Sequence, residues 1–410
     1  MNSRVAVFIK FVCLAYLIIG VSWFFSSSEK SKSHSHASKK LDMWFGLEYL
    51  VKSQKDFSIF KSMNLAVLCS PSSVDQQNQD SATVLLKNGF RVKNVFVFQD
   101  GKEKDKSSFI VFKKNIEKTM KVSCVAFHPK ESFVWNNNID ALIIDIQDFG
   151  VSGNSVIPLL KSIMKSAQHN RKKIIILDRP NPLGGKIEGS GDIPWRHGLT
   201  IGELGYYLNK NVLGYSVDLS VVPMVGWRRS RALHGLPYMD VSSIESLKMK
   251  PFLDVMNEIN PFSIDPDFKK SEQTVWIPEH KKLSKWELRY LKRLCWKLGL
   301  YCNGRVSKDK KLQGLKIGVK GNISKFSEFN SLLTVIRFLK NRKNIELTFT
   351  DNFDEKMGSS DVRRFLQGDM LFDDLKNKID QNVLTFYYKA KECLLYKPDI
   401  VVGATELIKG

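Results

Sequence analysis

The sequence predicts an α/β fold, in which a parallel sheet covered by helices is followed by a second, smaller α/β domain. Six short and almost continuously apolar runs occur before residue 223, each typical of a strand buried on both faces. Segments with helical periodicity lie between several of these runs, and strands that alternate with helices form a parallel sheet. The length of 410 residues exceeds what one hydrophobic core usually organises, which predicts the second domain.

The expected elements of the sheet domain follow in chain order. A helix at residues 41–52 comes first, because apolar side chains recur there near helical spacing. The expected strands cover residues 64–69, 92–98, 122–127, 140–146, 173–178 and 217–223. The helices between them cover residues 81–88, 155–168 and 200–209. Thr200 and Glu203 form the T-x-x-E pattern of a capping box, which marks the start of the last helix.

Periodicity weakens after Arg231, and residues 232–283 are expected to form an irregular connection. A strongly amphipathic helix is expected at residues 284–300, followed by a strand, a helix and a strand at 315–320, 329–341 and 345–350. Further helices are expected at 363–367, 372–378 and 383–393. We therefore expect a sheet domain at residues 41–285 and a C-terminal α/β domain at residues 286–410.

Residues 1–28 have the composition of a signal peptide or an N-terminal membrane anchor. Residues 5–25 are apolar apart from Lys10 and follow Arg4. Counted from Phe11 the run has the length of a signal-peptide core, whereas counted from Val5 it is long enough to span a bilayer. Residues 29–40 form a Ser/Lys/His linker. Both alternatives predict an exported protein of the periplasm or cell envelope, with residues 5–25 contacting the membrane if they stay uncleaved.

The formal net charge of +21 favours an anionic partner, either a polymer, a membrane surface or a nucleic acid. The basic residues are spread from Lys30 to Lys409, and the sequence has no zinc-finger, basic-zipper or RNP-type motif, so no nucleic-acid partner is expected. Five cysteines follow residue 28, an odd number without C-x-x-C spacing. This pattern argues against a disulfide framework or a zinc site and leaves only a Cys295–Cys302 pair open.

Polar residues follow two of the expected strands at their carboxyl ends. Asp178, Arg179 and Asn181 follow one strand, in a loop that two prolines stiffen. Asp145, Gln147 and Asp148 follow the preceding strand, and alternation places Asp145 and Asp148 on opposite faces. Binding sites in open parallel sheets form beyond these strand ends. The alternative is a stiff turn in which Asp178 and Arg179 only pair with each other.

A third polar segment precedes the capped helix. It contains Trp195, Arg196 and His197, and His197 is either a site residue or a structural histidine bonded to the backbone. Three sequence-distant segments that converge on one sheet edge with carboxylates, arginines, a histidine and a tryptophan indicate a small-molecule site, for which we expect a sugar as the ligand.

At these residues the sequence resembles the DUF1343 family, whose characterised members are exo-β-N-acetylmuramidases of the NamZ type. The segments that carry the resemblance are LDRPNPLGG, EGSGDIPWRHGLTIGEL, DIQDFG and VPMVGWRRS, and it extends from Phe45 to Tyr396. It implies a Rossmann-like sheet domain, a smaller C-terminal α/β domain, a site in the cleft and no required metal or nucleotide, so no cofactor is expected. The implied partner is a peptidoglycan-derived muramyl glycan or another anionic envelope polymer.

The sequence departs from the family pattern at its catalytic motif. The family carries a glutamate in a P-E-H-G motif as its proposed catalytic acid, and the aligned residues here read FQDG, with Gln99 at the glutamate position. An amide cannot donate a proton to a leaving glycosidic oxygen. The family's arginine and Y-T-Y triplet after DIQDFG are also absent, as are its recognisable motifs in residues 232–283.

The resemblance therefore implies an impaired or inactive exo-β-N-acetylmuramidase, or alternatively a non-catalytic peptidoglycan-binding or envelope-partner protein. The candidate residues fall into two groups. The catalytic candidates are Asp148, Asp100 and His197, with Gln99 at the position of the family glutamate. The candidate substrate-binding residues are Gln147, Arg179, Asn181, Trp195 and Arg196. No residues are expected to bind a metal.

Overall fold

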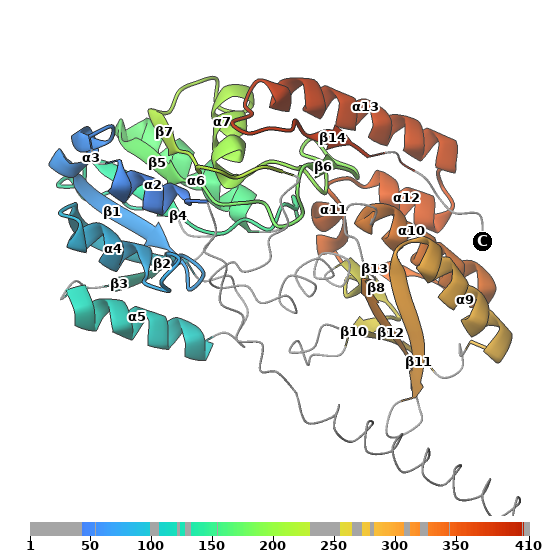
Figure 1. Cartoon of the computed structure of the whole chain (residues 1–410). Helices are drawn as coiled ribbons and strands as arrows, with labels where there is room; N and C mark the ends of the chain where they lie inside the picture. The colour runs from blue at the N-terminus through green and yellow to red at the C-terminus, as the bar shows by residue number, and fades with distance from the viewer. Residues whose placement is uncertain are drawn as a thin grey trace, which may run out of the picture. The chain divides into compact units, whose positions relative to one another are not determined.

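Six parallel strands form the main sheet, in the order β3-β2-β1-β4-β5-β7 (Figure 1). Their bounds are β1 (Asn64–Cys69), β2 (Arg91–Phe98), β3 (Cys124–Phe127), β4 (Ala141–Asp145), β5 (Lys173–Leu177) and β7 (Leu219–Val222). All six strands expected from the apolar runs are present, which confirms the α/β parallel-sheet prediction. The computed structural model describes residues 43–53, 55–98, 106–120, 124–127, 133–153, 155–229, 255–264, 273–278, 283–306, 312–319, 327–343, 345–403 and 405.

Helices cover both faces of this sheet, and the central strands β1, β4 and β5 are buried on both sides. In β1, Leu65 and Val67 belong to one buried cluster and Ala66 and Leu68 to another. The first cluster packs against α2 (Gly46–Lys52), α3 (Ser58–Ser62), α4 (Ser81–Lys87) and α5 (Lys106–Met120). The second packs against α6 (Val156–Asn170) and α7 (Ile201–Asn211) and continues into the C-terminal part of the chain. Helices α3 and α5 were not expected from the sequence.

The C-terminal part contains an antiparallel sheet in the order β11-β12-β10-β9. Its strands are β9 (Ser263–Ile264), β10 (Gln273–Pro278), β11 (Leu300–Val306) and β12 (Leu312–Val319). A separate pair joins β8 (Ile259–Asn260) to β13 (Thr348–Phe349). The prediction of an irregular connection throughout 232–283 is therefore wrong for the residues of β8, β9 and β10. Strands of two residues are too short to produce a periodic pattern, and pairing with distant strands stabilises them.

The helices of this part are α9 (Lys285–Lys297), α10 (Glu328–Lys343), α11 (Asn352–Met357), α12 (Asp361–Gln367) and α13 (Phe372–Lys391). The helices expected at 372–378 and 383–393 are one continuous helix, α13, since Ile379 and Val383 continue its buried stripe. The chain then returns to the sheet region. Tyr207 of α7 packs against Phe386 of α13 at 4.8 Å, and β14 (Val401–Val402) pairs with β6 (Lys186–Ile187).

Asp42–Gly410 forms one compact unit. The expected boundary at residue 285 stays a prediction, and β10 pairs with β12 across it. Within the described ranges, no helix combines the length and apolar character needed to cross a membrane. The expected signal peptide or anchor and the linker lie outside those ranges.

Candidate functional site

The three polar segments expected at one sheet edge do converge. Backbone bridges join Arg196 to both Val151 and Glu188. The Ser152 amide donates to the Trp195 carbonyl at 2.9 Å, and Asn181 Nδ2 donates to the Leu199 carbonyl at 2.8 Å. Residues 145–152, 178–183 and 195–200 therefore form one connected group of loops beyond the carboxyl ends of β4 and β5, which we call the loop edge.

Arg179 pairs with Asp145 of β4. Its Nε donates to Asp145 Oδ1 at 2.5 Å and Nη2 donates to Oδ2 at 2.8 Å, with both side chains fully buried. The guanidinium also donates to the Val74 carbonyl at 3.1 Å and lies 5.3 Å from the Phe45 ring. A bidentate pair of this kind fixes the guanidinium plane. The alternative in which Arg179 only pairs with Asp178 is wrong, because sheet neighbours β4 and β5 place Asp145 beside it.

Asp148 and His197, two of the catalytic candidates, lie together. His197 Nε2 is 3.3 Å from Asp148 Oδ2, and their side chains are 0% and 2% exposed. Asp148 Oδ2 also accepts from the Gly150 amide at 2.8 Å, and His197 Nδ1 accepts from the Leu199 amide at 3.2 Å. Since Nδ1 is an acceptor, a neutral imidazole carries its proton on Nε2, the ring nitrogen nearer to the Asp148 carboxylate, although the two groups are not hydrogen-bonded in this geometry. The pair has the chemistry of an acid–base couple, held by backbone groups.

The remaining candidates contact the loops themselves. Gln147 Nε2 donates to the Pro180 carbonyl at 2.8 Å, Arg196 donates to the Leu183 carbonyl, and Asn181 Oδ1 accepts from the Leu183 amide at 2.8 Å. The Trp195 ring lies 5.8 Å from that of Phe329. All of these side chains are buried. In this structure they hold the loop edge in shape, and their contact with a substrate stays a prediction.

Gly150 has a steric role at the loop edge. Its φ is +79°, and a Cβ placed on it would lie 2.3 Å from Asn181 Oδ1. Only glycine combines this backbone conformation with so close an approach. The glycine therefore allows the segment after β4 to contact the segment after β5.

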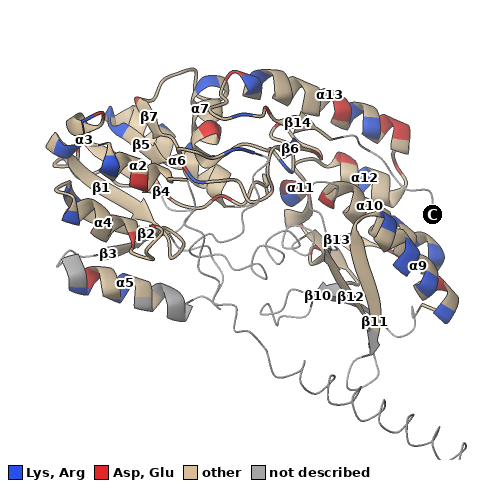
Figure 2. Cartoon of the chain, viewed as in Figure 1, with Lys and Arg blue, Asp and Glu red and all other residues tan. Residues whose placement is uncertain are grey.

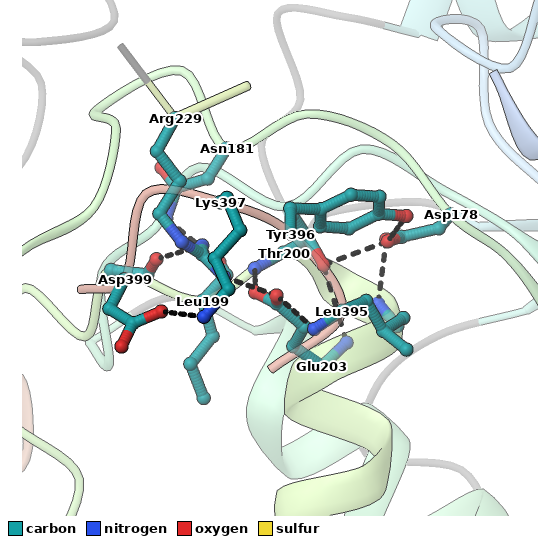
Figure 3. Close-up of polar contacts among 12 residues, drawn as sticks. Asp178, Asn181, Leu199, Thr200, Glu203, Arg229, Leu395, Tyr396, Lys397 and Asp399 are labelled. Carbon is teal, nitrogen blue, oxygen red and sulfur yellow. Dashed lines mark hydrogen bonds and ion pairs between the residues drawn. The ribbon is translucent and has the colours of Figure 1, made fainter. Parts of the chain in front are cut away.

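A second buried network centres on Asp178 (Figure 3). One carboxylate oxygen, Oδ2, accepts from Tyr396 Oη at 2.5 Å and from Thr200 Oγ1 at 2.8 Å. The other accepts from the amides of Arg179 at 2.9 Å and Gly202 at 2.8 Å. Burial, reinforced by the nearby Glu203 carboxylate, raises the pKa of Asp178 to about 7.

Glu203 joins the same network to the C-terminal segment. It completes the predicted capping box, since its Oε2 accepts from the Thr200 amide at 3.0 Å. Its other oxygen accepts from Arg229 and, at 2.8 Å, from the Leu395 amide. The carboxylate thus performs two tasks, of which the sequence indicated only the helix cap.

Glu188 connects the loop edge to helix α10. Its Oε1 accepts from the Glu328 amide at 2.8 Å and the Phe329 amide at 3.4 Å, and its Oε2 lies 2.8 Å from Lys186 Nζ. A carboxylate at a helix N-terminus satisfies free amides and interacts favourably with the helix dipole. Glu188 therefore links residues 186–196 to the C-terminal part of the chain.

Comparison with known proteins gives consistent matches over this region and beyond it. The family model described as exo-beta-N-acetylmuramidase NamZ, N-terminal, matches residues 65–244, which include the whole loop edge. The peptidoglycan beta-N-acetylmuramidase NamZ of Bacillus subtilis (strain 168) is 22% identical over 416 residues, covering 90% of this chain and 95% of that protein. Two crystal structures of DUF1343 family proteins from Bacteroides fragilis NCTC 9343 are similar to this structure, with TM-scores of 0.70 and 0.62. Each is 22% identical in sequence, and each match covers 87% of this chain and 99% or 100% of the chain in the crystal structure.

The chain is a divergent member of the DUF1343 family.

Two of the candidates in this DUF1343 protein, Gln99 and Asp100, lie outside the described residues, which stop at Phe98 of β2 and resume at Lys106. The part of the chain that is described contains no group of three or more His, Cys, Asp or Glu side chains suited to hold a metal ion. The expectation that the protein needs no cofactor stays a prediction.

The parts that Arg229, Tyr396 and Leu395 play in the buried network of Asp178 and Glu203 were not predicted from the sequence. Tyr396 lies 218 positions from Asp178, and no local pattern brings the two together. The one available signal was that the segments VPMVGWRRS and KECLLY, both part of the family resemblance, contain Arg229 and Tyr396.

Proposed function

We propose that this DUF1343 protein acts on peptidoglycan fragments as an exported exo-β-N-acetylmuramidase whose catalysis is impaired. The supporting observation is that the loop edge, with its Asp148–His197 pair, lies within the segment that matches the NamZ N-terminal model. The similarity to the Bacillus subtilis muramidase over 90% of the chain supports the same substrate class.

The described residues of the loop edge could hold a carboxyl group in position for glycoside hydrolysis. Asp148 is held by the Gly150 amide and lies 3.3 Å from His197 Nε2, while the Arg179–Asp145 pair fixes the neighbouring loop. A glycosidase needs a general acid that protonates the leaving oxygen and a second carboxyl group that assists the attack. Asp148 is the carboxyl group that we assign to the second task.

The impairment follows from Gln99, the residue at the position of the family glutamate. Glutamine keeps the shape of glutamate but carries no transferable proton, and losing a general acid typically lowers a rate by a factor of about 10² to 10⁴. Asp100 is the adjacent carboxyl group, with a side chain one methylene shorter than that of the missing glutamate.

A non-catalytic binding protein is the second candidate function. The observation that favours it is that the described candidates are buried and bonded to the protein itself. A stable scaffold of this kind, with Gln99 at the position of the family glutamate, would retain a glycan without cleaving it.

One experiment separates these functions. Wild-type protein, Gln99→Glu and the matched control Gln168→Glu, on the exposed side of α6, are incubated with para-nitrophenyl N-acetylmuramide and with muropeptides. We expect Gln99→Glu to release product at least about 10² times faster than the wild type and the control. Equal release by wild type and Gln99→Glu would contradict the impairment, and binding without release by any variant would support the binding protein.

A further inference from the structure

Helix α9 presents a cationic outer face that carries two tryptophans. Its inner side packs Leu291, Leu294 and Cys295 into the core. On the outer side, Trp286 and Trp296 are 59% and 60% exposed. The helix carries five basic residues, Lys285, Arg289, Lys292, Arg293 and Lys297, and all five are exposed. Figure 2 shows Lys and Arg positions recurring along α9.

The helix carries little compensating negative charge. Its single acidic residue is Glu287, whose carboxylate accepts from the Ser284 amide at 2.7 Å as part of a capping box. Arg342 of α10 adds a further exposed cation beside the face, 5.6 Å from the Trp286 ring. We call Trp286, Trp296 and the five basic residues of α9 the α9 face.

The two indoles lie toward opposite ends of the α9 face. Ten residues separate them, which corresponds to about 15 Å along the helix axis. Trp286 stacks on Tyr290 at 5.8 Å, and Tyr290 stacks on Phe338 at 5.6 Å, so the exposed ring is supported from the core. A tryptophan side chain combines a large apolar ring with a polar N–H group, which suits it to a boundary between an apolar and an aqueous phase.

We propose that the α9 face docks on an anionic lipid bilayer, with both indoles at headgroup depth and the basic side chains against lipid phosphates. Tryptophan is enriched at membrane–water interfaces, and clusters of Lys and Arg are attracted to anionic leaflets. The α9 face combines the two features on one side of a single helix. A nucleic-acid duplex would engage the cations but offers no apolar layer for two indoles set about 15 Å apart.

The sequence outside the described residues is consistent with docking on a membrane. Residues 5–25 form an apolar run long enough to span a bilayer. The 17 residues between that run and Met43 extend to at most about 60 Å, so an inserted run would tether Met43 within that distance of the same membrane. The docking proposal does not depend on glycosidase activity.

The first test measures binding of the full chain to vesicles of phosphatidylcholine with about 30% of the anionic lipid phosphatidylglycerol, and to vesicles of phosphatidylcholine alone. The variant Arg289→Glu/Lys292→Glu/Arg293→Glu reverses three charges on the α9 face. The control Lys114→Glu/Lys389→Glu/Lys391→Glu makes the same net change at exposed sites on α5 and α13. Each basic residue near an anionic surface contributes about fivefold in affinity, so we expect the α9 variant to lose at least about 100-fold in affinity for the anionic vesicles.

The control is expected to stay within about tenfold of the wild type, because distant exposed charges are screened. Equal losses in the two variants would overturn the proposal. It would also be overturned if the α9 variant lost binding to duplex DNA or to purified peptidoglycan sacculi while vesicle binding was unchanged.

The second test locates the indoles directly. Lipids brominated near the headgroup quench tryptophan fluorescence on contact, and the full chain is compared with Trp286→Phe/Trp296→Phe, which leaves Trp23 of residues 5–25 in place. We expect the double variant to lose most of the headgroup-depth quenching that the anionic vesicles produce. Unchanged quenching in the double variant would show that other tryptophans reach the lipid and would overturn the docking geometry.

Discussion

Tyr396 donates its hydroxyl hydrogen to Asp178 Oδ2 at 2.5 Å, joining the C-terminal segment to the loop that follows β5. The same hydroxyl oxygen accepts from the Met224 amide at 2.8 Å, and the Tyr396 ring packs edge-on against Trp227 at 4.9 Å. One side chain thus connects three segments that are distant in sequence. Because Tyr396 is buried, water cannot replace these bonds if the hydroxyl is removed.

Tyr396→Phe is expected to lower the free energy of unfolding by about 1–3 kcal/mol, since it leaves the Met224 amide and part of Asp178 without a partner. Urea unfolding followed by circular dichroism measures the change. Tyr388→Phe, at a tyrosine of α13 that is 66% exposed, is the matched control and should shift the value by less than about 0.5 kcal/mol. Equal effects of the two substitutions would show that the Tyr396 hydroxyl is not a tertiary anchor.

The raised pKa of Asp178 predicts a pH dependence. Between the ordinary value of 3.8 and about 7, the folded chain binds more protons at this site than the unfolded chain, so stability falls as the pH rises through this window. The comparison is with Asp178→Asn, which cannot titrate there. We expect the free energy of unfolding of wild type, relative to Asp178→Asn, to decrease from pH 4 to pH 7.

Asp192→Asn, at an exposed turn, controls for the loss of one negative charge. A difference between wild type and Asp178→Asn that stayed constant from pH 4 to pH 7 would contradict the assignment of a raised pKa to Asp178.

Removing only one partner of the Arg179–Asp145 pair is expected to be strongly destabilising. Arg179→Met leaves the Asp145 carboxylate buried without its counter-ion, at a cost of about 3–5 kcal/mol. The double variant Arg179→Met/Asp145→Leu replaces the whole pair with apolar side chains and should recover much of that loss. Urea unfolding measures the free energy of unfolding of both variants. A double variant as unstable as Arg179→Met would show that the unpaired Asp145 carboxylate is not what destabilises the single variant.

Gly150→Ala tests the close approach of the two loops. The substitution combines a strained φ of +79° with a collision against Asn181. Gly214→Ala is the matched control, because its φ is +60° but a Cβ there meets nothing within 4 Å. Both should pay about 1–2 kcal/mol for backbone strain, so a larger loss for Gly150→Ala in thermal unfolding reports the collision. Equal losses would mean that the loops separate readily.

Much of the fold could be predicted from local sequence. The strands β1, β4 and β5 are buried on both faces, which makes their apolar runs nearly continuous, and the cap of α7 depends on residues three positions apart. The convergence of the loop edge followed from the direction of parallel strands. Such features depend on short-range periodicity or on a general rule of sheet topology.

The bonding partners could not be predicted in the same way. Arg179 bonds to Asp145 across neighbouring strands, although Asp178 is adjacent in sequence, and Tyr396 reaches Asp178 from the far end of the chain. The first pairing depends on the order of the strands in the sheet, and the second depends on where α13 ends. Burial of the candidate residues was also missed, because a polar residue at a strand end looks the same in sequence whether it faces solvent or another loop.

The most direct test of the account is the rate of N-acetylmuramic acid release by Gln99→Glu, measured by mass spectrometry beside Gln99→Glu/Asp148→Asn and the wild type. We expect Gln99→Glu to release N-acetylmuramic acid. Adding Asp148→Asn should lower the rate of release by a factor of at least about 10², because the restored acid needs the Asp148 carboxylate as its partner. Equal rates for Gln99→Glu and the double variant, or a wild type as fast as Gln99→Glu, would contradict it.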